Sequence, residues 1–153
     1  MKKIIIGVIS VLVIIILIIF NNNHELKTKD YKNVIDNINF SIKEVKSSEK
    51  GDLITVKIKN NSKFKIYSNK LFFNYPLKDG NGYTENKYKV EALVNKRQIK
   101  SGEEIIVPIL IPIGDFIKKE SMAKNLLYYD YEGYINEVSN QNSFFIDNYI
   151  PIP

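Results

Sequence analysis

Tyr128, Asp130 and Glu132 are the residues whose types and spacing come closest to a functional site. They lie in the segment LLYYDYEGY, residues 126–134, and in a strand all three would point to the same side. Paired carboxylates about 5–9.5 Å apart can hydrolyse glycosides, but they must flank the scissile bond. Side chains two apart on one strand run parallel instead. We therefore interpret Asp130 and Glu132 as solvent-facing charges, and the three residues as a candidate binding surface for a sugar or a peptide.

Aromatic side chains are concentrated in the C-terminal third of the chain. They are Tyr128, Tyr129, Tyr131, Tyr134, Phe144, Phe145 and Tyr149. If the strand alternation holds, Leu127, Tyr129 and Tyr131 share the inner face, and Tyr128 points outward beside Asp130. Packing in a hydrophobic core therefore explains most of these rings.

Other features point away from catalysis, metals and cofactors. His24 is the only histidine and there is no cysteine, which excludes a histidine-based triad, a multi-histidine metal site and a thiolate. The segment DGNGYTEN (79–86) spaces Asp79 and Asn81 like two calcium ligands, but Val90 stands where the bidentate glutamate belongs. We interpret this segment as a hairpin loop, and we predict a protein that is not an enzyme and uses no cofactor.

The charge of the chain does not indicate a nucleic-acid partner. The formal net charge is +5, and Lys2 and Lys3 supply two of these charges. The remaining basic residues are too evenly mixed with acidic ones to form a nucleic-acid footprint. We therefore predict no nucleic-acid binding.

Residues 4–20, IIIGVISVLVIIILIIF, form an uncharged apolar run. As a helix of about 1.5 Å per residue it would be roughly 25 Å long, at the short end of what crosses a bilayer. A cleaved signal peptide is the alternative, but such apolar regions are usually shorter and end in a small-x-small motif. We predict an uncleaved signal anchor over residues 1–20, which contacts the lipid bilayer through residues 4–20.

The charges that flank the apolar run suggest its orientation. Lys2 and Lys3 favour a cytoplasmic N-terminus, although Lys27, Lys29 and Lys32 on the other side weaken that bias. We predict a single-pass protein of the cell membrane with an extracellular ectodomain. Residues 21–33 are polar and are expected to form a stalk, and residues 34–153 are expected to form the ectodomain.

From about residue 34 apolar residues recur at every second position, which is the period of a half-buried strand. In ITVKIK, Ile54, Val56 and Ile58 are expected to face the core, and Lys57 and Lys59 to face solvent. The predicted strands cover residues 38–42, 53–59, 64–66, 71–75, 88–94, 105–111, 126–132 and 143–149.

Two prolines place the predicted strand 105–111 at a sheet edge or leaving the sheet. Pro108 and Pro112 are four residues apart, so both remove backbone donors from the same side of the strand, which a central strand could not tolerate. The segment GDFIKKESMAKN (114–125) is the only helix expected in the ectodomain. Short strands separated by turns at about 8–12 residues predict an all-β, antiparallel sandwich of about seven strands.

Two segments, LITVKIKNNSKFKI (53–66) and KSGEEIIVPILIP (100–112), resemble the telokin-like, immunoglobulin-like domains of small exported proteins of low-GC Gram-positive bacteria. The likeness covers roughly residues 34–150. It implies an immunoglobulin-like fold on an exported, membrane-tethered chain, in a group that commonly has no assigned activity. This chain departs from the lipid-anchored members because it has no lipobox cysteine.

Two functions fit these observations. The first is a membrane-anchored extracytoplasmic module that binds an envelope protein or the cell wall. The second is a membrane-tethered immunity or inhibitor protein, which would block a secreted toxin or enzyme. The sequence does not distinguish them.

Overall fold

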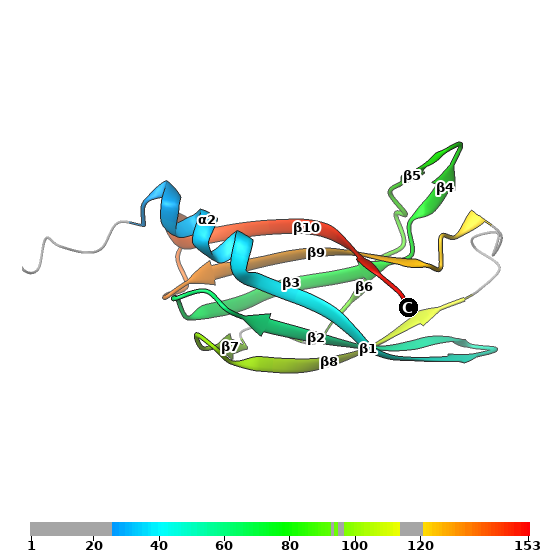
Figure 1. Cartoon of the computed structure of the whole chain (residues 1–153), viewed down its shortest axis with the longest axis horizontal. Coiled ribbons are helices and arrows are strands. Elements are labelled where there is room, and N and C mark those ends of the chain that lie inside the picture. Colours follow the sequence, from blue (N-terminus) through cyan, green and yellow to red (C-terminus); the bar gives the residue numbers. More distant parts are fainter. Residues whose placement is uncertain (1–25, 93, 95–96, 114–120) are drawn as a thin grey trace, which may run out of the picture.

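The computed structural model describes residues 26–92, 94, 97–113 and 121–153 (Figure 1). These residues form mostly β-strands in antiparallel sheets, which confirms the predicted all-β sandwich at that level. The elements are α2 (Thr28–Asn37), β1 (Ile38–Ser48), β2 (Gly51–Asn60), β3 (Ile66–Asn74), β4 (Leu77–Asp79), β5 (Gly82–Thr84), β6 (Val90–Glu91), β7 (Gln98–Ile99), β8 (Glu104–Pro112), β9 (Leu126–Ile135), the 3₁₀ turn η2 (Asn140–Asn142) and β10 (Ser143–Pro151).

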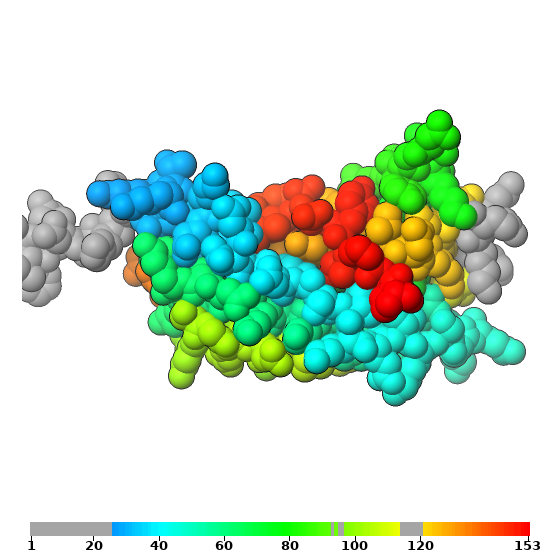
Figure 2. Space-filling view, in the orientation of Figure 1, coloured from blue at the N-terminus to red at the C-terminus, as the bar shows by residue number. Residues whose placement is uncertain are grey.

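Two sheets lie face to face. The smaller has the strand order β1-β2-β8, and the larger has the order β10-β9-β3-β6, with β7 also paired to β3. The ring of Phe40 on β1 stacks on that of Tyr129 on β9, with 4.0 Å between centroids, so the inner faces meet in one core. The β4–β5 hairpin is a separate two-stranded sheet that projects at the end opposite α2 (Figures 1 and 2).

The period-two pattern of β2 has the predicted register. Ile54, Val56 and Ile58 are fully buried, while Lys57 and Lys59 lie on the outer face. The register is firm because a slip of one residue would bury the lysines in place of the apolar side chains.

Asn60 and the residues after it carry the chain from one sheet to the other. The Asn60 amide donates to the carbonyl oxygens of Phe64 (2.7 Å) and Ile99 (3.1 Å), and its Oδ1 accepts from the Ser62 N–H (3.0 Å). The segment NNSK therefore leads into the next strand of the sandwich, as predicted, but that strand is β3 of the opposite sheet. The partner of β2 in a hairpin is β1.

The prediction that residues 105–111 form an edge strand is confirmed. Among the described residues, β8 pairs only with β2, and Pro108 lies opposite Thr55 in that ladder. Even-numbered residues of β8 point outward and odd-numbered residues point into the core.

Several predicted strands differ in extent. Ile66 and residues 71–74 of the predicted strands 64–66 and 71–75 belong to one strand, β3, which begins at Ile66. The predicted strand 88–94 shrinks to Val90–Glu91. A side-chain turn at Asn86, whose Oδ1 accepts from the Tyr88 N–H at 3.0 Å, competes with strand pairing at that point. Of the predicted helix 114–125, residues 114–120 lie outside the described part, and Met122 bridges to Leu77 instead of continuing a helix.

Helix α2 begins within the segment that the sequence predicts to be a stalk. Residues 28–33, assigned to the stalk, form the first part of α2, which packs through the fully buried Val34. The Asp30 carboxylate accepts from the Lys27 N–H (3.0 Å) and so satisfies a free donor at the helix start. The predicted anchor lies outside the described residues; within them, no helix is long and apolar enough to cross a membrane.

Candidate functional site

The pairing of β9 with β10 gathers polar and aromatic side chains on the outer face of the larger sheet. Tyr128 lies opposite Tyr149, Asp130 opposite Asp147, and Glu132 opposite Phe145. Because alternate residues of each strand share a face, these six side chains lie on one surface. Phe145 is 57% exposed and Tyr149 is 40% exposed.

The β4–β5 hairpin adds a third tyrosine to this surface. The Tyr83 ring lies 6.4 Å from the Tyr149 ring, and the Tyr149 ring lies 5.2 Å from that of Tyr128. The hairpin itself turns through Gly80, whose φ of 55° suits glycine, so the interpretation of residues 79–86 as a hairpin loop is confirmed. We refer to Tyr83, Tyr128, Asp130, Glu132, Phe145, Asp147 and Tyr149 as the tyrosine–carboxylate face.

Asp130 is not the solvent-facing charge that the sequence predicts. It is buried, and its carboxylate is paired with the Lys89 ammonium, which also binds Glu85 at 2.7 Å and lies 5.4 Å from the Tyr128 ring centroid. Burial alone would lower the pKa of Lys89, but its hydrogen bonds to Asp130 and Glu85 raise it. The cause of the burial is the segment before β6, which reaches Asp130 from 41 positions away in the chain.

Glu132 fits its prediction better. Its side chain is partly exposed, and its nearest cation is the Lys70 ammonium at 4.0 Å. A contact this long between exposed groups contributes little to stability. Glu132 therefore remains available on the surface.

Asp147 is the carboxylate of the face that is least compensated by cations of the described residues. It is exposed, accepts a hydrogen bond from the Tyr128 hydroxyl at 3.3 Å, and has no lysine or arginine within 4.0 Å among the described residues. It lies directly opposite Asp130, and like charges at such cross-strand positions destabilise a sheet. The face thus carries an unbalanced negative charge on a chain whose net charge is positive.

The Tyr128 hydroxyl is held in its protonated form. Burial, followed by the neighbouring carboxylates of Asp130 and Asp147, raises the pKa of Tyr128 well above its ordinary value. A tyrosine hydroxyl is already protonated at physiological pH, and the raised pKa keeps that of Tyr128 a hydrogen-bond donor in alkaline solution as well.

A groove borders the tyrosine–carboxylate face, between the edges of β1 and β10. It has a volume of about 440 Å³. Its lining includes Asp36, Asn39, Phe40, Tyr129, Asp147 and Tyr149. Asp147 and Tyr149 belong to both features, so a ligand on the face can extend into the groove.

The arrangement offers aromatic surface, hydrogen-bond acceptors and a free carboxylate. Among the described residues, no group of three or more histidine, cysteine or acidic side chains is placed to hold a metal ion. Tyr128, Asp130 and Glu132 do come together as predicted. Sequence reasoning missed Phe145, Asp147 and Tyr149, which the alternation in SFFIDNYI could have added once β10 was paired with β9. Nothing local in the sequence signals Tyr83 or Lys89.

Comparison with protein-family models, with curated proteins and with solved structures finds no match to this chain.

Proposed function

We propose that this protein is a membrane-anchored binding module whose immunoglobulin-like sandwich acts outside the cytoplasm at the cell envelope, without catalysis. The apolar run at residues 4–20 supports the anchor, a cytoplasmic N-terminus and an extracellular domain. The observation that carries the binding role is the tyrosine–carboxylate face. Tyrosine is among the residue types enriched in protein-binding hot spots, and Tyr83 and Tyr149 of this face are exposed.

The geometry of the rings favours a protein partner over the cell-wall glycan. The Tyr83 and Tyr149 rings are inclined by 43°, and the Tyr128 and Tyr149 rings by 58°. A sugar stacks best on a flat aromatic platform, whereas tilted rings leave gaps that side chains can fill. The exposed carboxylate of Asp147 favours a partner segment that contains lysine or arginine, because no cation of the described residues pairs with it.

Site-specific cross-linking in intact membranes tests this proposal. A photo-reactive amino acid at Tyr149 should capture an envelope protein, and the same group at Leu110, a comparably exposed residue on β8 of the other sheet, should not. Asp147→Lys should abolish the adduct at position 149. Equal capture at both positions, or an adduct that survives Asp147→Lys, would exclude the face as the binding site.

The same face suits the second candidate function, a membrane-tethered immunity or inhibitor protein. The supporting observation is again the unbalanced negative charge, which could cover a cationic surface of a secreted toxin or enzyme. The identity of the captured protein separates the two functions. A resident envelope protein supports the structural module, and a secreted toxin or hydrolase whose activity falls on binding supports the inhibitor.

A further inference from the structure

Helix α2 is fixed to the sandwich at several points. Val34 is fully buried, and the Tyr31 hydroxyl donates to the Gln141 carbonyl. The Lys63 N–H donates to Asn33 Oδ1 at 3.2 Å, and the Asn61 N–H donates to the Asn37 carbonyl at 2.8 Å. The helix and the domain therefore move as one body, and the start of α2 lies at one end of the described part of the chain (Figure 1).

The connection from this end to the apolar run is short. The run ends at Phe20 and the described chain begins at Leu26, so five residues lie between them. Even fully extended, that link spans only about 20 Å. If residues 4–20 span the bilayer, as proposed above, the start of α2 stays close to the lipid headgroups.

Lysines gather at this end, and their placement opposes the helix dipole. Lys27, Lys29 and Lys32 are exposed and lie at or near the N-terminus of α2, where positive charge is unfavourable. Among the described residues, none of the three ammonium groups has an acidic partner within 4.0 Å. Asp30, the one acidic residue of the first turn, is bound to the Lys27 N–H and to the Lys63 ammonium at 3.2 Å.

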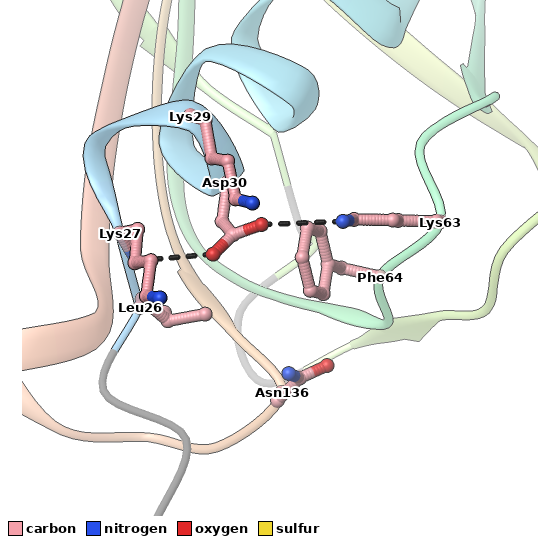
Figure 3. A pocket seen from close by; sticks show the side chains of 7 residues that line it. All are labelled: Leu26, Lys27, Lys29, Asp30, Lys63, Phe64 and Asn136. Carbon is pink, nitrogen blue, oxygen red and sulfur yellow. Dashed lines mark hydrogen bonds and ion pairs between the residues drawn. The ribbon is translucent and has the colours of Figure 1, made fainter.

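Lys27, Lys29, Asp30 and Lys63 line a hollow of about 280 Å³ (Figure 3), and Lys32 lies outside its lining. Leu26 and Phe64 supply apolar surface there, and Lys63 lies over the Phe64 ring at 4.8 Å. Hydrogen bonding from Lys27, followed by Lys63, lowers the pKa of Asp30 despite burial, so its carboxylate stays charged and keeps Lys63 in place. Even with this carboxylate, cations outnumber anions around the hollow.

We propose that the α2 end of the domain docks on an anionic lipid surface, with Lys27, Lys29, Lys32 and Lys63 facing the headgroups. This inference rests on the proposed membrane anchor. It adds an orientation, because docking at α2 points the β4–β5 hairpin away from the bilayer (Figures 1 and 2). Each lysine near such a surface contributes roughly a five-fold preference over a neutral surface. The effect fades beyond a Debye length of about 8 Å at physiological salt.

Fluorescence quenching in reconstituted vesicles tests the orientation. The chain has no cysteine, so Thr28→Cys on α2 and Asn81→Cys on the far hairpin each accept one label on the full-length protein. The vesicles contain phosphatidylcholine with or without phosphatidylglycerol, together with a headgroup-attached quencher. We expect the label at position 28 to be quenched roughly two-fold more in the anionic vesicles, and the label at position 81 to show no difference.

A charge-reversal pair supplies the matched control. Lys29→Glu with Lys32→Glu should remove the extra quenching at position 28, as should high salt. Lys78→Glu with Lys87→Glu makes the same change of net charge at exposed positions near the hairpin and should leave the quenching intact. Circular dichroism of both pairs checks that the sandwich is folded.

The outcomes separate this inference from the anchor. The docking surface is contradicted if the protein binds vesicles but its quenching at position 28 is the same with and without anionic lipid. It is also contradicted if Lys29→Glu with Lys32→Glu leaves the extra quenching intact. Neither result contradicts the anchor. Protein that fails to float with vesicles of either composition would overturn the anchor and the docking surface together.

Discussion

Strands β2 and β9 are both flanked on two sides within their sheets and share the same alternating pattern, but their outer faces differ. On β2 the outward residues Lys57 and Lys59 extend into solvent, and the Lys57 ammonium is 3.8 Å from the Glu104 carboxylate. On β9 the outward residue Asp130 is buried beneath Lys89. The period of two determines which side of a sheet a residue occupies. Whether that side is exposed to solvent depends on segments that are distant in the sequence.

The inner face of β2 should give the largest effect. Val56→Asp places an unpaired carboxylate among fully buried apolar side chains and should cost about 3–5 kcal/mol, enough to unfold a marginal domain. Lys57→Asp, on the adjacent outward position, should cost less than about 1 kcal/mol. Thermal melts of the two variants decide this. Similar losses of stability in the two variants would show that the outer face of β2 is not exposed to solvent.

The outer face of β9 should respond more strongly than that of β2. Lys89→Met leaves the buried Asp130 carboxylate without its cation and should destabilise the domain by about 2 kcal/mol. Lys70→Met removes the distant partner of Glu132 and should cost no more than about 0.5 kcal/mol. Urea unfolding measures both variants. If Lys89→Met costs no more stability than Lys70→Met, the ion pair of Lys89 with Asp130 does not contribute significantly to the free energy of unfolding.

Alkaline pH should affect the inner face of β9, where the buried rings are tyrosines. Burial raises the pKa of Tyr129 to about 12, with a further contribution from Asp147, and burial raises the pKa of Tyr131 to about 12. Because the folded values exceed the unfolded value of about 10, the stabilising contribution is complete below pH 10. It is lost between about pH 10 and 12, by up to about 1.4 kcal/mol per pH unit for each tyrosine.

A single substitution isolates one of these groups. Tyr129→Phe removes one of the two hydroxyls with a raised pKa and should make the loss of stability above pH 10 visibly less steep. Tyr83→Phe, on the exposed hairpin ring, should leave the slope unchanged. Urea unfolding from pH 9 to 12 gives both slopes, and identical slopes for wild type and Tyr129→Phe would contradict the assignment.

The smallest expected effect has the opposite sign. Asp147→Asn removes the negative charge that faces Asp130 across the β9–β10 pair and should stabilise the domain by about 0.5 kcal/mol. The same substitution should weaken capture of the partner at Tyr149. Asp147→Glu keeps the charge and should change neither property much. A destabilised Asp147→Asn variant would mean that this carboxylate is retained for the fold and not for binding.

Local periodicity was sufficient to predict the scaffold. Ile54, Val56 and Ile58 alternate with polar residues, and Pro108 and Pro112 mark an edge, so these predictions depend only on near neighbours in the chain. Helix α2 was missed because its apolar contacts, such as Val34, are few among lysines and asparagines. Its stability comes from tertiary packing, which no local pattern displays.

The candidate site was only half predictable for the same reason. Tyr128, Asp130 and Glu132 follow from one strand, but the charge balance at Asp130 depends on Lys89, and the aromatic surface depends on Tyr83. Both residues belong to the segment between β3 and β6, residues 75–89. A sequence pattern cannot show which way such a segment folds.

The ladder between β1 and β2 has a mechanical consequence. If the chain is anchored ahead of α2, as proposed, and a partner holds it at β10, tension that breaks the contacts of α2 with the sandwich then acts on β1 from Ile38, along the strand. The ten registered pairs from Ile38–Asn60 to Ser48–Gly51 lie side by side along that direction. Their hydrogen bonds share the load in shear and do not open one after another. Resistance to forced unfolding is governed by the unfolding rate, so this geometry suits a domain that holds a partner under tension.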